Sequence, residues 1–216
     1  MKTISLKSYA KLNVGLQILN KRSDSFHNIH TLFQEIDLFD TIFLEKKKTG
    51  CGFSTNVNWL KNNDSNLCVR AWKRMSEIFE VGGINIFLNK KIPRESGLGG
   101  GSSNAATVLK GLRKLYDLNI ADKQLENLSS KLGADVPFFI KGGLQSGDGI
   151  GDKLIRLNGR IPGKILLVIP RKKISTSWAY NNYKKFLDRS KERVNFASFL
   201  KRDPVPYELF ENDFET

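Results

Sequence analysis

The chain has 216 residues, of which 40% are hydrophobic, and its formal net charge is +13 at pH 7. That length can bury a sizeable core in one large or two small domains, and the positive charge favours anionic partners such as phosphorylated small molecules, nucleic acid or an acidic membrane surface. No apolar run approaches the roughly 20 residues of a membrane span and the N-terminus lacks the apolar stretch of a secretory signal, so we expect a cytoplasmic protein without a membrane partner.

Alternating apolar and polar residues predict strands in the N-terminal part of the chain. The expected strands cover residues 3–9, 11–19, 31–38, 41–46 and 84–88. A polar loop is expected over 20–28, and Phe39-Asp40 is predicted to form a turn between two strands. Asp64-Ser65 is predicted to cap an amphipathic helix that follows it.

Later residues mix helices and strands without regular alternation, which indicates an α+β fold. One helix is expected directly after the glycines at 97–101, and Asp122 is predicted to cap another. Residues 132–140 are expected to form a helix end that runs into a short strand. The glycine-rich stretch 142–151 is expected to break the pattern.

The last part of the chain predicts a separate unit. Ile165 to Ile169 is an apolar run that predicts a buried strand stopped by Pro170, and helices are expected at 176–187 and 194–200. We place a domain boundary near residue 158. The expected domains are an N-terminal domain over 1–158 and a C-terminal domain over 159–216.

One glycine-rich segment lies between a predicted strand and a predicted helix, and it reads Pro93-Arg94-Glu95-Ser96-Gly97-Leu98-Gly99-Gly100-Gly101-Ser102-Ser103. Glycine lets the backbone approach a ligand closely and adopt positive φ. The first N–H groups of a helix lack intrahelical partners and carry the positive end of its dipole, which favours phosphate binding. The segment matches neither a Walker A loop nor G-x-G-x-x-G. A flexible connector capped by Ser102 or Ser103 is the alternative.

Asp135 and Lys11 are candidates for catalysis. Asp135 lies just before the apolar run Phe138-Phe139-Ile140, and a carboxylate beside a buried element must be paired or functional. The alternative is an ordinary cap or turn residue. Lys11 lies at a strand edge beside Asn13, where a solvated lysine is the alternative.

The polar loop carries an aromatic residue followed by an imidazole, Phe26-His27, which could stack on a nucleobase and bond to it, or simply pack. His27 and His30 lie three residues apart, but no cysteine or acidic cluster completes a metal site. Cys51 and Cys68 form no C-x-x-C pair and no zinc spacing, so ordinary reduced thiols are expected.

Several segments together resemble the GHMP kinases, and within them the 4-diphosphocytidyl-2-C-methyl-D-erythritol kinase family, over almost the whole chain. Besides the glycine-rich segment, they are Ala10-Lys11-Leu12-Asn13, Asp24-Ser25-Phe26-His27, Asn66-Leu67-Cys68-Val69-Arg70-Ala71 and Leu132-Gly133-Ala134-Asp135-Val136-Pro137. The resemblance implies ATP-dependent phosphorylation of the 2-hydroxyl of a CDP-linked methylerythritol, in the non-mevalonate isoprenoid precursor pathway.

The resemblance also implies roles for individual residues. Asp135 would be the general base on the acceptor hydroxyl, and Lys11 would keep it ionised and stabilise the transferring phosphoryl group. Backbone N–H groups of the glycine loop would bind the ATP phosphates. The implied ATP-binding residues are Pro93, Gly97, Leu98, Gly99, Gly100, Gly101, Ser102 and Ser103.

On the substrate side, the resemblance implies that Asn13 contacts the substrate near the base and that His27 binds the cytosine edge. Phe26 and Tyr180 would stack on either side of the cytosine, and Thr176 would contact the substrate nearby. Position 26 is often tyrosine in this family; phenylalanine keeps the stacking but lacks the hydroxyl. Mg²⁺ is expected to accompany ATP, and Ser103 is considered as a ligand for it.

The sequence departs from the family after Asn212 to Glu215, where members continue with a third glycine-rich motif and the rest of the second domain. We therefore expect a GHMP-kinase-like fold with an incomplete second domain, lowered stability and weak or absent turnover. Two alternatives stay open: another GHMP-type kinase, such as a homoserine kinase, and a basic, non-catalytic nucleic-acid-binding protein. Phe26-His27 and the Lys11/Asp135 pair favour the kinase of the CDP-linked methylerythritol over both alternatives. We therefore expect no nucleic-acid partner.

Overall fold

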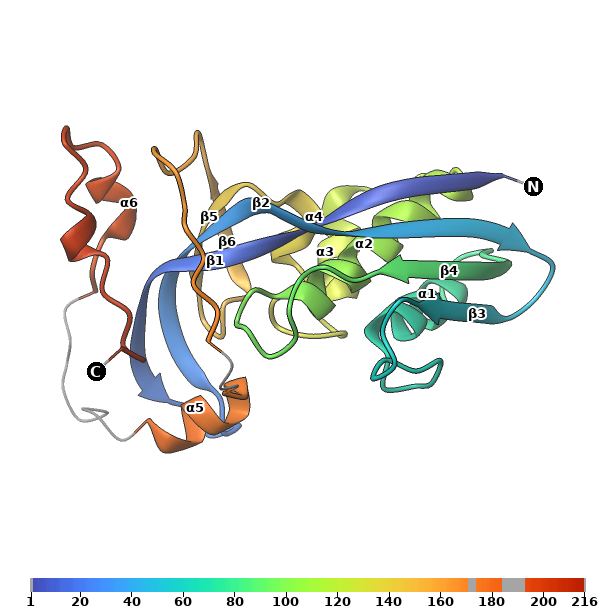
Figure 1. The fold of residues 1–216 in the computed structure, drawn as a ribbon, viewed down its shortest axis with the longest axis horizontal. Helices are drawn as coiled ribbons and strands as arrows, with labels where there is room; N and C mark the ends of the chain where they lie inside the picture. Colours follow the sequence, from blue (N-terminus) through green and yellow to red (C-terminus); the bar gives the residue numbers. More distant parts are fainter. Residues whose placement is uncertain (1, 171–173, 184–192, 216) are drawn as a thin grey trace. The chain divides into compact units, whose positions relative to one another are not determined.

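The computed structural model describes residues 2–170, 174–183 and 193–215 (Figure 1). Two compact units divide the chain. Unit 1 comprises residues 1–10, 36–94 and 98–141, and unit 2 comprises residues 11–35, 95–97 and 142–216. Two long strands, β1 (Thr3–Lys21) and β2 (His27–Lys47), contribute residues to both units. The boundary expected near residue 158 stays a prediction.

Unit 1 contains a sheet whose strands are pinned by regular pairing. Strand β4 (Gly83–Asn89) runs antiparallel to β2, with Thr41 opposite Asn89, and β3 (Cys51–Thr55) runs parallel to β4. Alternate residues point to opposite faces of a strand. Leu44, Ile86 and their inward neighbours are therefore buried, whereas the opposite face stays open to solvent.

Four helices belong to unit 1: α1 (Leu67–Ser76), α2 (Gly100–Leu115), α3 (Asp122–Ser129) and α4 (Phe138–Lys141). Helix α2 lies against the sheet, and Gly111 is the closest point of approach. A Cβ there would come within 2.3 Å of Leu44 Cδ1 and 2.9 Å of Leu6 Cδ1. At the other end of α2, Tyr116 donates a hydrogen bond of 2.7 Å to the Gly83 carbonyl at the start of β4.

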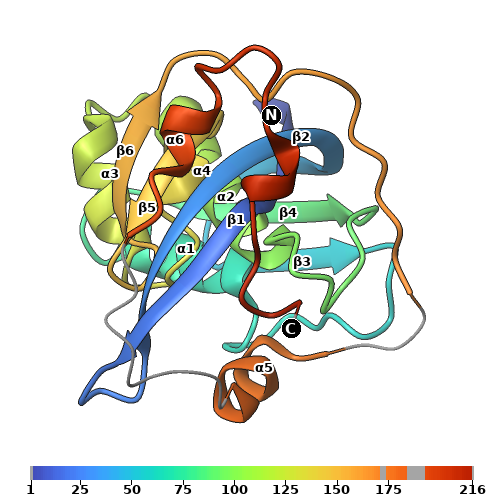
Figure 2. The same ribbon diagram turned by 90° about the vertical axis from the view of Figure 1, so that its left-hand side faces the viewer.

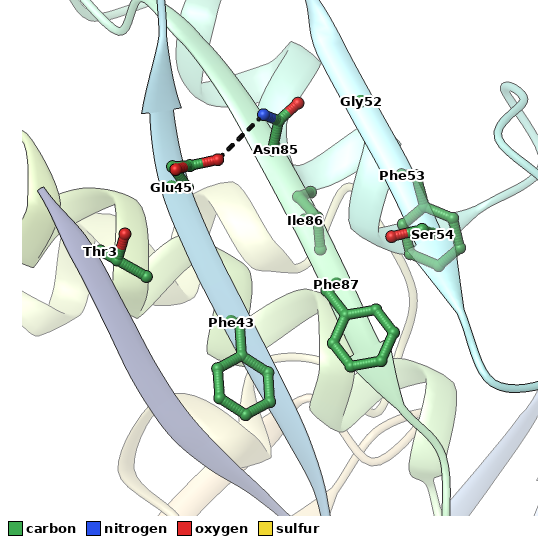
Figure 3. A pocket seen from close by; sticks show the side chains of 9 residues that line it. All are labelled: Thr3, Phe43, Glu45, Gly52, Phe53, Ser54, Asn85, Ile86 and Phe87. Atoms are coloured by element: carbon green, nitrogen blue, oxygen red, sulfur yellow. Dashed lines mark hydrogen bonds between the residues drawn. The ribbon is translucent and has the colours of Figure 1, made fainter. Parts of the chain in front are cut away.

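The open face of the unit 1 sheet carries a shallow pocket (Figure 3). Phe43 and Phe87 point from β2 and β4 into it, with ring centroids 5.8 Å apart. Asn85 donates a hydrogen bond of 3.2 Å to Glu45 beside them. None of the predicted site residues lines this pocket, so it is separate from the candidate site.

In unit 2, further strands pair with the first part of β2 (Figure 2). Strand β5 (Leu144–Asp148) pairs antiparallel with β2, where Thr31 lies opposite Gly147, and with β6 (Lys153–Leu157). Helices α5 (Thr176–Asn182) and α6 (Phe196–Phe199) and the short 3₁₀ helix η1 (Tyr207–Leu209) complete the described part of this unit.

The last residues of the chain lie along β1 within unit 2. The Leu16 N–H donates to the Glu211 carbonyl at 2.8 Å, and the Asp213 N–H donates to the Leu16 carbonyl at 2.9 Å. The Asp213 carboxylate also accepts a hydrogen bond of 2.7 Å from the Ile18 N–H. These bonds satisfy part of the β1 edge, which would otherwise expose unpaired backbone groups.

The mixed content of helices and strands confirms the predicted α+β class, and the strand at 84–88 is confirmed as β4. Other strand predictions were wrong in detail. The pairs predicted at 3–9 and 11–19, and at 31–38 and 41–46, are each one continuous strand. Asp40 forms no turn because its carboxylate is buried and paired with Lys90.

Two predicted caps were also wrong. The N-cap of α1 is Asn66, whose side chain accepts a hydrogen bond of 2.9 Å from the Cys68 N–H, rather than the Asp64-Ser65 pair. Helix α3 begins at Asp122 itself, with Ala121 as the N-cap. The Asp122 carboxylate instead pairs with Arg113 at 2.7 Å.

Further along the chain, the expected short strand after residue 135 is the helix α4, and the glycine-rich stretch 142–151 contains β5. The apolar run from Ile165 to Ile169 is not a buried strand. It forms no described ladder, and Leu166 and Val168 are more than four-fifths exposed. The helix predicted over 176–187 is described only as far as residue 183, and part of that prediction lies outside the described residues.

Candidate phosphate loop and substrate site

The glycine loop reaches α2 through a left-handed turn. Gly99 is the N-cap residue with φ 69° and ψ 17°, and Gly97 has φ 72°. No side chain caps α2. Ser102 and Ser103 lie inside the helix, which excludes the alternative in which they cap it. The start of α2 therefore presents backbone N–H groups and the positive end of the helix dipole without a side-chain acceptor.

The glycines of this loop serve different purposes. A Cβ on Gly100 would come within 2.9 Å of Ile92 and 3.1 Å of Lys90 Nζ, so this glycine is required by packing. Gly101 is exposed, and a Cβ there would make only an ordinary contact of 3.6 Å with Leu67. Nothing lies within 4 Å of a Cβ on Gly97. Gly97 and Gly101 thus leave space above the backbone that a ligand could use.

A buried polar network lies beneath the start of α2. The Asp40 carboxylate is fully buried and accepts four hydrogen bonds, from Lys90 Nζ (2.6 Å), Asn104 Nδ2 (2.8 Å) and the N–H groups of Lys91 (2.6 Å) and Ile92 (2.8 Å). Sequence reasoning missed these residues because it assigned Asp40 to a turn. The available signal was a charged residue interrupting an otherwise alternating strand.

The network continues to β1 through two hydroxyl groups. Asn104 Nδ2 also donates to Ser8 Oγ at 2.9 Å, and Ser8 Oγ lies 2.8 Å from Ser103 Oγ. Ser8 and Ser103 are both buried. The Ser103 hydroxyl is therefore directed into the protein.

Asp135 lies in the turn that leads into α4 of unit 1 and is half-buried. The Val136 N–H donates to the Gly133 carbonyl at 3.2 Å, which closes this turn. Lys110 of α2 donates a hydrogen bond of 2.7 Å to the Phe139 carbonyl and ties the following helix to α2. Asp135 and most of the glycine loop thus belong to the same compact unit.

Lys11 and Asn13 are held together in unit 2. Lys11 Nζ donates to Asn13 Oδ1 at 2.5 Å, and Asn13 Nδ2 donates to Thr31 Oγ1 at 2.9 Å. The Lys11 ammonium also lies 5.3 Å from the centre of the Phe33 ring, and Lys11 is only 5% exposed. Both predicted side chains are therefore fixed in position by neighbours.

The predicted nucleobase residues occupy one region of unit 2. The His27 and Tyr180 rings stack with centroids 5.4 Å apart and planes at 19°, and Phe26 is 55% exposed. His27 Nδ1 is buried and has no hydrogen-bond partner within the described residues. Burial, together with the nearby charge of Lys21, lowers the pKa of His27, so this ring favours its neutral form.

Thr176 is the first residue of α5 and lies one turn before Tyr180. The structure therefore groups the predicted residues by unit. Unit 1 holds Pro93, Leu98 to Ser103 and Asp135, and unit 2 holds Lys11, Asn13, Phe26, His27, Gly97, Thr176 and Tyr180. No helix described in the structure combines the length and apolar character needed to cross a bilayer.

Comparison with known proteins identifies related sequences. The model of the GHMP kinases N terminal domain matches residues 66–143. The chain is 40% identical to a 4-diphosphocytidyl-2-C-methyl-D-erythritol kinase of Chlorobium luteolum, covering 100% of this chain and 77% of that protein. It is 41% identical to the kinase of the same name from Chlorobium chlorochromatii, covering 97% and 74%. The chain thus spans about three quarters of these relatives.

Solved structures give the same grouping. A crystal structure of 4-(cytidine 5'-diphospho)-2C-methyl-D-erythritol kinase superposes with a TM-score of 0.75 at 29% identity, covering 98% of this chain and 76% of the other. The mevalonate kinase of Methanococcus jannaschii superposes with a TM-score of 0.62 at 15% identity, covering 99% and 75%, and shares the fold. Since the identity to full-length relatives extends over the whole chain, it belongs to the 4-diphosphocytidyl-2-C-methyl-D-erythritol kinase family of GHMP kinases.

Proposed function

We propose that this chain is an ATP-dependent kinase that phosphorylates the 2-hydroxyl of 4-diphosphocytidyl-2-C-methyl-D-erythritol, in the non-mevalonate isoprenoid pathway. Family membership supports this assignment, and the alternatives of another GHMP-type kinase or a nucleic-acid-binding protein receive no comparable support. A cytoplasmic location is part of the proposal.

The single observation that carries the proposal is the start of α2. Gly99 adopts a left-handed conformation, no side chain caps the helix, and Gly101 next to it is exposed. An anion placed there would receive several N–H hydrogen bonds and a favourable helix dipole. The terminal phosphates of ATP fit this description, with Pro93 and Gly97 to Ser103 forming the loop around them.

The proposed chemistry requires a base and a charge-stabilising cation. Asp135 would accept the proton of the acceptor hydroxyl. The oxygen of that hydroxyl would form a bond to the γ-phosphorus of ATP, and ADP would leave as the bond between the γ-phosphorus and the β–γ bridging oxygen breaks. Lys11 would stabilise the negative charge on the transferring group. Its hydrogen bond to Asn13 supports this role, since a fixed ammonium needs little reorganisation when that charge develops.

Cytosine recognition is assigned to the His27 region. The unpartnered Nδ1 of His27 is a hydrogen-bonding atom that burial makes costly to leave unsatisfied. A nucleobase edge would satisfy it. We propose that Phe26 and Tyr180 stack on this base and that Thr176 contacts the substrate nearby; in the structure Tyr180 stacks on the His27 ring itself, so Tyr180 would have to rearrange to hold the base.

Mg²⁺ is expected to neutralise part of the ATP phosphate charge, as in other kinases. The residue considered as its ligand does not fit that role, because the Ser103 hydroxyl is buried and lies 2.8 Å from Ser8 Oγ. Among the described residues, no group of three His, Cys, Asp or Glu side chains could hold a metal ion. We therefore assign no step to a metal held by the protein.

The test is phosphoryl transfer by the chain and by its Asp135→Ala variant. The parent should transfer ³²P from γ-labelled ATP to the methylerythritol substrate. Asp135→Ala should lose transfer by roughly 10²–10⁴-fold, the usual contribution of a general base, while its ATP affinity stays within twofold. Asp122→Asn, a surface aspartate in the same unit, is the matched control. Normal turnover by Asp135→Ala would exclude it as the base.

A further inference from the structure

The buried Asp40 carboxylate contacts both ends of the glycine loop. At the entrance, it accepts hydrogen bonds from the Lys91 and Ile92 N–H groups, directly before Pro93. At the exit, it accepts a hydrogen bond from Asn104, in the second turn of α2. One side chain therefore joins the residues on either side of the segment that is proposed to hold the ATP phosphates.

Lys90 adds a charge to this arrangement. Its side chain is only 6% exposed, and its ammonium bonds to Asp40 at 2.6 Å and to Asn104 Oδ1 at 3.2 Å. The same ammonium lies 3.1 Å from the position of a Cβ on Gly100, so it is directly beneath the first residue of α2. Without Asp40, an unpaired cation would lie at the positive end of the helix dipole.

Asp40, Lys90 and Asn104, at the centre of this network, each make at least two hydrogen bonds within it. The Asn104 amide donates to Asp40 and Ser8 and accepts from Lys90. A fully satisfied buried network holds its members in one arrangement, whereas loss of one member leaves polar groups unpaired. The start of α2 is therefore held in place through the buried Asn104, whereas Gly101 is exposed.

We propose that Asp40 is a positioning residue for ATP: through Asn104 and the N–H groups of Lys91 and Ile92, it holds the loop in the conformation that binds the phosphates. Asp40 itself is fully buried and touches neither substrate. The inference rests on the proposed function of the loop. It assigns an active-site role to a residue that contributes only through the backbone it holds.

Two variants test this role. Asp40→Asn/Lys90→Met removes both charges together, which avoids leaving one buried charge unpaired. Asn104→Ala keeps the Asp40–Lys90 ion pair and the entrance contacts, and it removes the hydrogen bonds of the Asn104 side chain to Asp40, Lys90 and Ser8. The matched control is Arg113→Met/Asp122→Asn, which removes a more exposed ion pair of the same unit.

The measurements are the thermal melt of each variant and its calorimetric affinities for MgATP and for CMP, a probe of the proposed cytidine site. We expect both test variants to bind MgATP about tenfold more weakly, the effect of losing roughly one charge-assisted hydrogen bond to phosphate. Their CMP affinity should stay within twofold of the parent value. The control should match the parent in both affinities.

Three outcomes would overturn the proposal. If Asn104→Ala or a folded Asp40→Asn/Lys90→Met binds MgATP as tightly as the parent, the network has a structural role only. If the affinities for MgATP and CMP fall together, the effect is general loss of structure. If the parent itself binds no MgATP, the proposed function of the loop fails, and this inference fails with it. Should the double variant not fold, Asn104→Ala alone decides.

Discussion

Substitutions of Gly99 and Gly101, at the start of α2, allow effects on stability to be separated from effects on ligand binding. Gly99 has φ 69°, a conformation that alanine adopts only at a cost of about 1–2 kcal/mol. Gly101 lies inside the helix, where alanine is favoured over glycine by up to about 1 kcal/mol. Its added methyl group would meet only Leu67 Cδ1, at 3.6 Å. Gly99→Ala should therefore destabilise the protein, and Gly101→Ala should not.

The two variants should differ by roughly 2 kcal/mol in the free energy of unfolding. For chains of 150–250 residues, 1 kcal/mol shifts Tm by about 2–4 °C, so their melting temperatures should differ by about 4–8 °C. Circular dichroism melts measure this difference. Gly50→Ala is a control for Gly99→Ala, since Gly50 also has positive φ (72°), has nothing within 4 Å of its added Cβ, and lies in the β2–β3 turn away from the loop.

The effects of these substitutions on ATP affinity should differ from their effects on stability. The methyl group of Gly101→Ala occupies the exposed surface that we assign to the phosphates, so the MgATP dissociation constant should rise about tenfold, equivalent to losing roughly one charge-assisted hydrogen bond. Gly50→Ala should bind MgATP normally although it is less stable. These roles of Gly101 are wrong if Gly101→Ala melts several degrees below the parent, or if it is as stable as the parent and binds MgATP equally well.

Three further predictions concern other parts of the chain. Burial raises the pKa of Cys51 to about 11 and that of Cys68 to about 12, so at pH 8 the thiolate fraction is only about 10⁻³ for Cys51 and about 10⁻⁴ for Cys68. Mass spectrometry after iodoacetamide treatment should therefore show slow labelling of both cysteines in the native chain. Rapid labelling of Cys68 would contradict its burial. The pKa of His27 is lowered in the folded chain, so the unfolded chain binds the proton at higher pH, and the contribution of His27 to stability is lost as the pH falls through about 6.5. In melts from pH 8 to 5.5, the melting temperature of His27→Gln should therefore fall less than that of the parent. Equal falls would contradict the lowered pKa. Gly15→Ala should lower stability by more than about 1 kcal/mol, because Gly15 has φ 81° and its Cβ would lie 2.6 Å from the Phe196 ring; an unchanged denaturant midpoint would contradict that packing.

The local features of the loop could be predicted from the sequence. Three consecutive glycines after an apolar strand, followed by apolar residues at helical spacing, are sufficient to place β4, the loop and α2. They also indicate an anion site, because that inference requires only the backbone at a helix start. The N-cap conformation of Gly99 agrees with this local reasoning.

The non-local features could not be predicted in this way. Asp40 has the local signature of a turn residue, and only its contact with Lys90, fifty positions later, makes it a buried strand residue. Conversely, Ile165 to Ile169 has the signature of a buried strand, but a strand also needs a paired neighbour, and none is described beside this segment. The composition of a segment indicates which secondary structure it favours locally. Contacts with residues distant in the sequence decide whether that structure forms.

The Asp40–Lys90 ion pair also constrains how this chain can change over evolutionary time. Losing either partner alone leaves an uncompensated buried charge, which typically costs 3–5 kcal/mol, whereas replacing both with neutral residues of similar size is often tolerated. Since marginally stable proteins have only about 5–15 kcal/mol in reserve, most single-step routes away from this pair pass through a poorly folded intermediate. The two positions, separated by the last third of β2 and the whole of β3, α1 and β4, are therefore expected to be inherited as one unit.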